Sequence, residues 1–112
     1  MYSNGEKVLY LDPIGPIKTA KILNQRFTEK GNRYFIELNP DIQGDKSQFT
    51  VYHNDITPIY FRGSNVYIRT WDGTKPGQVV ALVEHDEMGY AYQVMLPDDS
   101  ISLYDPRRVY KY

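Results

Sequence analysis

Apolar and polar residues alternate along short stretches of the chain, and turn-forming residues separate these stretches. Side chains of a strand point to opposite faces with a period of two, so the alternation predicts half-buried β-strands. The helical period of 3.6 residues holds nowhere for three turns, which argues against a substantial helix. We predict strands at 7–11, 19–24, 34–38, 48–52, 65–69, 78–84, 92–96 and 100–104.

Glycine and proline mark the predicted turns, because Gly tolerates positive φ and Pro presets φ near the value that turns need. Each group of four strands is followed by a short closing stretch, which we take as a fifth strand. The turns are predicted at Asp12–Pro16, Glu29–Asn32, Asn39–Asp41, Trp71–Gly77, Glu87–Tyr90 and Pro97–Asp99, and the closing stretches at 54–59 and 106–110.

The order of these features repeats when the chain is shifted by 58 residues against itself. Without gaps, the shift gives nine identical pairs over the 40 positions from Tyr2 to Asp41, more than unrelated sequence supplies. Beyond Asp41 the first copy carries a six-residue insertion within 42–48. We infer a tandem duplication with copies 1–59 and 60–112. The alternative is two β-rich stretches that share Gly and Tyr only by composition.

Further matches extend the repeat on both sides of the insertion. Ile22 matches Val80 in the same register, and after the insertion Val51 matches Leu103. Six of the 11 tyrosines then form repeated pairs that we interpret as structural, namely Tyr2/Tyr60, Tyr34/Tyr92 and Tyr52/Tyr104. The tyrosines left as functional candidates are Tyr10, Tyr67, Tyr90, Tyr110 and Tyr112.

Each copy carries three segments of one common series. The series runs from a Gly-x-x-Val start through an apolar strand and an aromatic-led strand to a closing Asp segment. The segments are Gly63–Val66, Gly77–Leu82 and Tyr92–Leu96 in the second copy, and Gly5–Val8, Tyr34–Leu38 and Asp55–Ile59 in the first. This order resembles the Tudor/SH3-like small-barrel class. The resemblance implies an all-β protein of two tandem five-stranded barrels. Because a barrel of about 55 residues buries a thin core, and bulky residues join the copies, we expect the barrels to pack together.

Composition narrows the function classes. The 13 Lys and Arg balance 14 Asp and Glu, so no long-range field recruits nucleic acid or an anionic membrane. The absence of Cys excludes disulfides, thiolate zinc sites and Cys nucleophiles. The sequence shows neither a signal peptide nor an apolar run long enough to span a bilayer, so we expect a cytoplasmic protein.

Catalytic chemistry has little support in the residues. His53 and His85 are the only histidines, they fall at different repeat positions, and neither has zinc-ligand spacing. We expect His53 to bond a turn and His85 to lie solvated at a strand end. Nucleophile-elbow, phosphate-loop and dinucleotide motifs do not occur. The acidic residues Asp98, Asp99 and Asp105, with Asp41 and Asp45, are interpreted as turn residues, and we expect no enzyme activity, cofactor or metal.

The resemblance to Tudor domains implies an aromatic cage that holds a methylated Lys or Arg by cation–π attraction. Trp71 fits the first wall of such a cage in the second copy. The other walls would fall near Leu96 and Asp98, and in the first copy near Pro13 and Leu38, which are not aromatic. Neither copy therefore carries a complete cage.

The leading hypothesis is a non-catalytic protein-binding module, since Tyr offers a large rigid contact area at low entropy cost. Trp71 precedes Asp72-Gly73 in a turn, where it serves as an interface anchor or folds back as a lid on its own barrel. We expect Trp71, Tyr90 and Tyr110 to bury against a partner while Arg107 and Arg108 set its orientation. Residue usage typical of AT-rich coding favours a phage or mobile-element protein that acts on a host complex in the host cytoplasm, as a monomer or homodimer.

Nucleic-acid binding is the alternative. Five basic residues, Lys18, Lys21, Arg26, Lys30 and Arg33, fall within 16 residues, and Arg107, Arg108 and Lys111 lie among tyrosines at the chain end. Against this, residues 1–59 hold 7 Lys and Arg to 7 acids, and residues 60–112 hold 6 to 7. Phosphate binding normally shows as a basic surplus.

Overall fold

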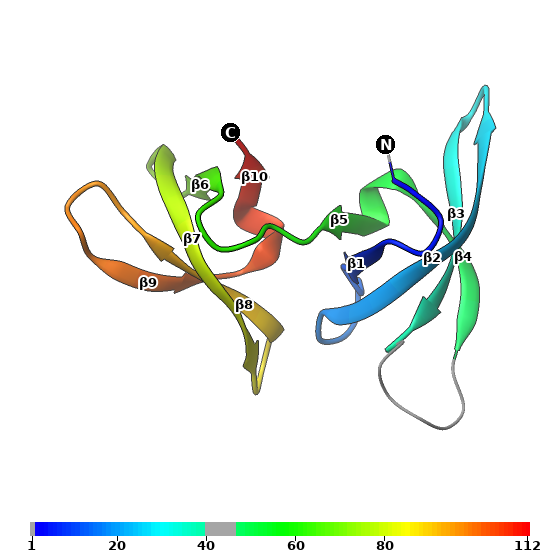
Figure 1. The fold of residues 1–112 in the computed structure, drawn as a ribbon, viewed down its shortest axis with the longest axis horizontal. Coiled ribbons are helices and arrows are strands. Elements are labelled where there is room, and N and C mark those ends of the chain that lie inside the picture. Colours follow the sequence, from blue (N-terminus) through cyan, green and yellow to red (C-terminus); the bar gives the residue numbers. More distant parts are fainter. Residues whose placement is uncertain (1, 40–46) are drawn as a thin grey trace. The chain divides into compact units, whose positions relative to one another are not determined.

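The computed structural model describes residues 2–39 and 47–112, which are almost entirely strands joined by turns and two short 3₁₀ helices (Figure 1). The predicted all-β class is confirmed. The chain divides into two compact units, Met1–Ile59 and Tyr60–Tyr112, here called unit 1 and unit 2. Each unit contains one five-stranded antiparallel sheet, an arrangement compatible with small-barrel folds.

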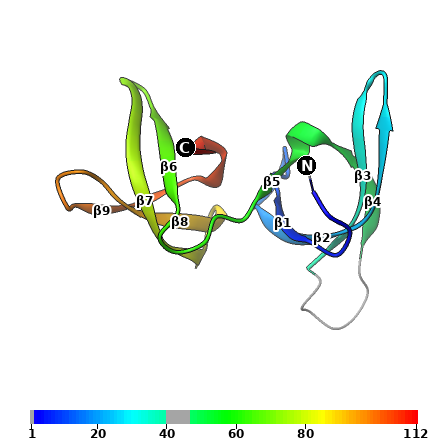
Figure 2. The ribbon, with the colours of Figure 1, turned by 45° about the horizontal axis from the view of Figure 1, so that its top comes forward.

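Unit 1 has the strand order β4-β3-β2-β1-β5, so the last strand returns to pair with the first (Figure 2). The short 3₁₀ helix η1 turns the chain between the fourth strand and the fifth. The elements are β1 (Lys7–Tyr10), β2 (Lys18–Thr28), β3 (Gly31–Leu38), β4 (Gln48–Tyr52), η1 (His53–Asp55) and β5 (Ile56–Pro58).

Unit 2 repeats this order, as β10-β6-β7-β8-β9, with a 3₁₀ helix again before the last strand. Its elements are β6 (Asn65–Thr70), β7 (Gly73–His85), β8 (Gly89–Met95), β9 (Ile101–Tyr104), η2 (Pro106–Arg108) and β10 (Val109–Lys111). The predicted strand positions are therefore confirmed in both halves, although β2 and β7 run further at both ends and β3 and β8 begin three residues earlier than the sequence pattern indicated.

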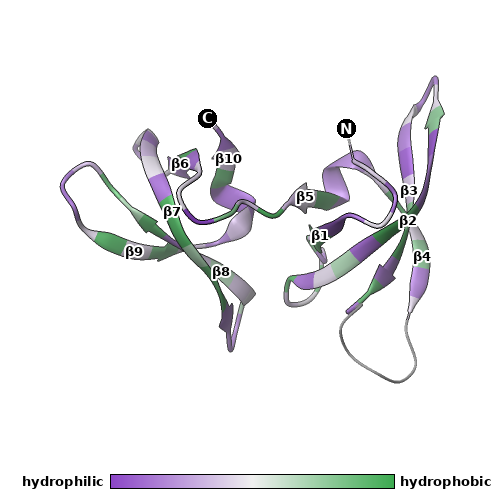
Figure 3. Ribbon diagram, viewed as in Figure 1, coloured by the Kyte–Doolittle hydropathy of each residue, from purple (hydrophilic) through white to green (hydrophobic). Residues whose placement is uncertain are grey.

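Each core lies on the inner face of its sheet, where alternate residues are buried. In β6, Val66 and Ile68 are fully buried while Tyr67 between them is exposed, and Figure 3 shows the corresponding alternation of hydropathy along the strands. The core of unit 1 consists of Tyr2, Val8, Ala20, Ile22, Tyr34, Ile36, Val51 and Ile56. The buried residues of unit 2 are Val66, Ile68, Val79, Ala91, Tyr92, Val94, Pro106 and Val109.

A β-bulge interrupts the second strand of each unit at the same place. The register of β2 against β3 shifts between Ile22 and Asn24. The register of β7 against β8 shifts between Val79 and Ala81. Such a bulge bends the strand and increases its twist, which lets a short sheet curl around a small core.

These registers correct the sequence match of Ile22 with Val80. Ile22 pairs with Ile36 and Val79 pairs with Val94, so Ile22 is equivalent to Val79. Between equivalent pairs, the first hairpin of unit 2 is one residue shorter than that of unit 1. Its second hairpin is one residue longer, which restores the 58-residue shift on the third strand. Two compensating length changes are invisible to an ungapped comparison.

The fourth strands correct a second match. Tyr34 pairs with Val51, whereas Tyr92 pairs with Tyr104, so Val51 is equivalent to Tyr104. The shift therefore falls from 58 to 53, which makes the insertion five residues long and not six. Tyr52 consequently matches Asp105, and Tyr52/Tyr104 is not a repeated pair. Most of the insertion, with Pro40, Asp41 and Asp45, lies outside the described residues.

The turn predicted for Trp71–Gly77 is too long. Thr70 pairs directly with Gly73, so only Trp71 and Asp72 form the turn. Pro76 lies within β7, opposite Tyr67, in the portion of the strand that precedes the pairing with β8 at Gln78. A proline lacks a backbone N–H, and it is tolerated here because this portion has a neighbour on one side only.

Candidate binding surfaces

In each unit a fully buried tyrosine, Tyr34 or Tyr92, contacts a second tyrosine ring. The rings of Tyr2 and Tyr34 meet edge to face at 5.3 Å between centroids, and those of Tyr60 and Tyr92 lie 5.9 Å apart. The Tyr60 N–H donates to the Tyr92 hydroxyl at 3.0 Å. Burial raises the pKa of Tyr92 to about 12. These four tyrosines agree with the structural interpretation of the repeated pairs.

The outer side of β6 and β10 carries a cluster of exposed aromatic residues, here called the tyrosine face and defined as Tyr67, Arg69, Tyr110 and Tyr112. Tyr67 pairs with Tyr110 across the two strands. The rings of Tyr67 and Tyr112 stack at 4.7 Å with an interplanar angle of 16°. The Arg69 guanidinium carbon lies 6.0 Å from the centroid of the Tyr110 ring.

A shallow cavity of about 290 Å³ lies on this face, lined by Tyr67, Arg69, Thr74 and Tyr110. The neighbouring Tyr112 phenol raises the pKa of Tyr67 above its usual value. Tyr67 and Tyr112 were already candidates as unpaired tyrosines. Arg69 was missed, and its position two residues after Tyr67 in an alternating strand is the signal that would have found it.

Trp71 lies in the two-residue turn that joins β6 to β7, directly after Thr70, and its side chain is 94% exposed. The alternative in which Trp71 covers its own barrel is therefore wrong. In unit 1 the loop between the first two strands carries Ile14, which is 96% exposed. Both units thus present a large apolar side chain to solvent in the loop of their first hairpin.

The other predicted partner-binding residues fall in different places. Tyr90 is half-buried and pairs with Glu84, ten residues along β7 from Thr74, so it does not belong to the tyrosine face. Arg107 and Arg108 lie in η2, immediately before β10, and both are exposed. The Asp105 carboxylate lies 3.4 Å from the Arg107 guanidinium, which uses part of that charge within the unit.

Both histidines have structural partners. A hydrogen bond of 3.2 Å joins His53 Nδ1 to the hydroxyl of buried Tyr34. His85 Nδ1 accepts the backbone N–H groups of Glu87 and Met88 at 3.2 and 3.0 Å. His85 ends β7, as expected, and its ring also organises the turn between β7 and β8.

The aspartates near the end of unit 2 act as turn residues. Asp98 Oδ1 accepts the Ser100 N–H at 3.1 Å, and the Ser100 hydroxyl bond lowers the pKa of Asp98 below its usual value. Asp105 Oδ1 accepts the Arg107 N–H at 2.8 Å and caps η2. In the described ranges, no group of three His, Cys, Asp or Glu residues could hold a metal ion.

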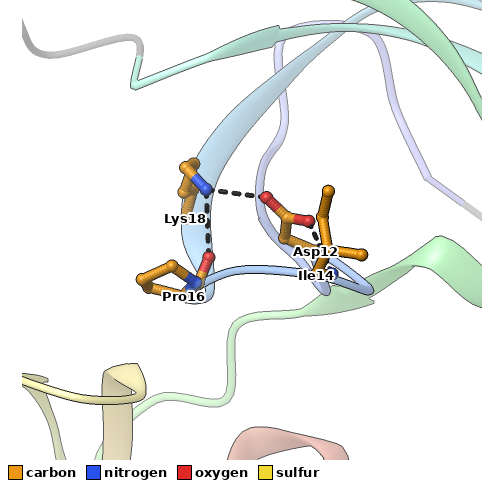
Figure 4. Close-up of polar contacts among 4 residues, drawn as sticks. All are labelled: Asp12, Ile14, Pro16 and Lys18. Atoms are coloured by element: carbon orange, nitrogen blue, oxygen red, sulfur yellow. Dashed lines mark hydrogen bonds and ion pairs between the residues drawn. The ribbon is translucent and has the colours of Figure 1, made fainter.

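Two of the five basic residues predicted to bind nucleic acid are engaged in ion pairs within unit 1. Lys18 Nζ lies 2.8 Å from the Asp12 carboxylate and also donates to the Pro16 carbonyl, and Asp12 accepts the Ile14 N–H in the same loop (Figure 4). Lys21 lies 3.9 Å from the Glu37 carboxylate. These two lysines are therefore less available to a phosphate than the sequence indicated.

The remaining three basic residues lie on the hairpin of β2 and β3. Arg26 pairs directly with Arg33, and Lys30 is exposed in the turn between the strands. Arg26, Lys30 and Arg33 form no ion pair with any described residue. A cavity of about 230 Å³ lies at the two arginines, here called the arginine pocket. It is lined by Asn24, Gln25, Arg26, Arg33, Tyr34, Phe35 and Thr50.

No protein-family model matches the chain, and no curated protein is similar to it. Among residues 2–39 and 47–112, no helix combines the length and the apolar character needed to cross a lipid bilayer. The tyrosine face and the arginine pocket are therefore the features of this protein that point to a function.

Proposed function

We propose that the protein is a non-catalytic module that binds a partner protein through the tyrosine face and Trp71 of unit 2. The single observation that carries the proposal is the 94% exposure of Trp71, in the turn that ends the strand of the stacked Tyr67. Exposed tryptophan and tyrosine are the residues that most often anchor protein interfaces, because they bury a large rigid area when a partner docks.

Arg69 supports a partner segment that carries a carboxylate. Its guanidinium is exposed, lies over the Tyr110 ring and has no acidic partner among the described residues. An aspartate or glutamate of the partner would pair with this cation while apolar side chains cover the rings. Exposed Arg108 directly precedes β10 and exposed Lys111 ends it, so both add to the positive charge near Tyr110.

For the fold, we propose that both units belong to the Tudor/SH3-like small-barrel class. The return of the last strand to the first, through a 3₁₀ helix, supports this assignment. Origin in a phage or mobile element, action on a host protein complex and residence in the host cytoplasm stay predictions from composition and size.

The test compares Trp71→Ala with Ile14→Ala, since both remove a large apolar side chain that is more than nine-tenths exposed. Capture of a partner from a nuclease-treated host lysate should fail for Trp71→Ala and Arg69→Ala and persist for Ile14→Ala. Thermal unfolding should be unchanged in all three, because exposed side chains contribute within about 0.5 kcal/mol.

Two outcomes contradict the proposal. Loss of thermal stability in Trp71→Ala would assign the indole to the core. Concentration-dependent dimerisation that Trp71→Ala abolishes, measured by sedimentation, would show that a second copy of the chain covers this face in place of a different protein.

A further inference from the structure

The arginine pocket of unit 1 places two like charges opposite each other. Arg26 on β2 and Arg33 on β3 are direct cross-strand partners. Like charges in that position are destabilising unless an anion lies between or beside them. Lys18 and Lys21, on the same strand as Arg26, are each paired with a carboxylate, whereas neither arginine pairs with a carboxylate of residues 2–39 or 47–112.

Arg33 Nε, a donor of this pocket, is buried and lacks a hydrogen-bond partner among the described residues. Buried donors normally have a partner, so the pocket fits a ligand that accepts hydrogen bonds. Gln25 Oε1 is also buried without a partner among these residues, but Gln25 pairs with the core residue Tyr34 and its Nε2 donates to the Tyr2 carbonyl at 2.6 Å. Its side chain therefore lies on the core face of the sheet, opposite the arginines.

Aromatic rings flank the same pocket. Phe35 lines it and is 38% exposed, and Tyr52, on the neighbouring strand β4, is 54% exposed. The Arg33 guanidinium carbon lies 5.4 Å from the centroid of the Tyr52 ring, which fixes that cation at the pocket wall. Exposed rings beside cations are the arrangement on which unpaired bases stack while phosphates are neutralised.

We propose that the arginine pocket binds one or two phosphates and an adjoining unpaired base of a single-stranded nucleic acid. The phosphate oxygens accept from Arg26 and Arg33, and Phe35 or Tyr52 stacks on a base. A carboxylate side chain of a protein would satisfy the arginines but would leave the exposed rings uncovered. A double helix would keep its base faces from the rings.

The charge of the chain sets the extent of this site. With a formal net charge of −1, the protein has no long basic track, so the site is short. For single strands, the logarithm of the binding constant falls against the logarithm of the salt concentration with a slope of about −0.7 per phosphate contacted. Two phosphates held by the two arginines therefore give a slope near −1.4. Unit 2 lacks the site, because the residues equivalent to Arg26 and Arg33 are Val83 and Ala91.

This equivalence supplies the variant for the test. The double substitution Arg26→Val and Arg33→Ala introduces residues that unit 2 already carries at the same registers, so it is expected to fold. The control is Arg107→Ala with Arg108→Ala, which removes the same charge elsewhere. The probe is a fluorescently labelled oligothymidylate of about 12 nucleotides, followed by anisotropy at several salt concentrations.

The full-length protein should bind the oligomer with a salt slope near −1.4. The Arg26/Arg33 variant should bind about tenfold or more weaker with a slope near zero, while the Arg107/Arg108 control stays within about twofold. Arg33→Lys, which keeps the charge and loses the fork of donors, should fall between the two. If the double variant unfolds by circular dichroism, Arg33→Lys and Phe35→Ala carry the comparison.

Several results would overturn the proposal. Equal losses in variant and control would show diffuse attraction without a site. Thymidine monophosphate binding as tightly as the oligomer would make the ligand a free nucleotide, and a glutamate-rich or phosphotyrosine peptide binding more tightly would make it a protein. Undetectable binding of the oligomer at low salt would exclude the strand outright. The substitutions lie in unit 1, so failure here leaves the protein-binding proposal for unit 2 standing.

Discussion

The two units share an inner face and differ on their outer faces. Strand order, bulge position, a 3₁₀ helix before the last strand and a fully buried tyrosine in contact with a second tyrosine ring are common to both. Unit 1 carries Arg26 and Arg33 where unit 2 carries half-buried Val83 and fully buried Ala91. Conversely, unit 2 carries the exposed Tyr67 and Tyr110 where unit 1 carries fully buried Leu9 and half-buried Thr57.

This contrast shows which positions packing constrains. Inner side chains must fill a small closed volume, so Val8 and Val66 or Tyr34 and Tyr92 are identical, and Ile22 differs from Val79 by one methylene only. Exposed positions need only stay compatible with a strand, and their chemistry is free to change. The surfaces that differ between the units are therefore where we place binding, one on each unit.

The largest expected effect tests the equivalence of the buried tyrosines. Tyr34→Ala and Tyr92→Ala should each lower the free energy of unfolding of their unit by about 3–5 kcal/mol, because both rings are fully buried. Chemical denaturation monitored by hydrogen exchange measures the loss in each unit. Tyr52→Ala, at a half-exposed ring, serves as the control and should cost far less. A cost below about 1 kcal/mol for either buried tyrosine would contradict a shared core design.

The next effect concerns alkaline pH in unit 2. Tyr92 has a pKa of about 12 in the folded protein, against an ordinary value near 10. The unfolded chain loses this proton first, so the contribution of Tyr92 to stability is intact below pH 10 and declines as pH rises towards 12. The decline totals at most about 2.7 kcal/mol. The free energy of unfolding in urea should fall more steeply from pH 9 to 12 in the native protein than in Tyr92→Phe. Identical pH profiles of the two proteins would contradict the assignment.

A smaller effect separates the second strands. A Cβ on Gly77 would lie 2.5 Å from Val94 Cγ1, whereas the equivalent residue in unit 1 is Ala20, which is fully buried without such a clash. Gly77→Ala should destabilise unit 2 by about 2 kcal/mol, because the branched Val94 side chain has little rotamer freedom to move away. Adding Val94→Ala should recover part of the loss, as thermal unfolding of the double variant would show. Unchanged stability in Gly77→Ala would mean that this strand shifts freely.

Much of the fold follows from the sequence, because strand positions depend on local alternation and turn residues. The starts of β1, β4 and β6 agree with the pattern to the residue. The extent of β7 was missed, since Pro76 and Gly77 are turn formers unless a strand has only one neighbour there. The equivalence of Ile22 with Val79 was missed because two opposite one-residue changes in hairpin length cancel before the next identical pair.

The candidate sites were less accessible to sequence reasoning, for a physical reason. Lys18 and Arg26 look alike in a basic run, and only the chain path shows that Asp12 neutralises the first while Arg33 opposes the second. Likewise, the orphaned atoms of Gln25 and Arg33 depend on burial that no local pattern encodes. Exposure of Trp71 was one of two predicted alternatives, and the two-residue turn decides it because nothing in so tight a loop can cover an indole.

The bond from the Tyr60 N–H to the Tyr92 hydroxyl has a consequence for cutting the chain. The units divide between Ile59 and Tyr60, yet the donor in this bond is an uncharged amide only while a peptide bond precedes Tyr60. A protease cut at the division would replace that amide by an α-ammonium and set a charge against a buried phenol. A fragment that carries unit 2 alone therefore has to begin at or before Ile59.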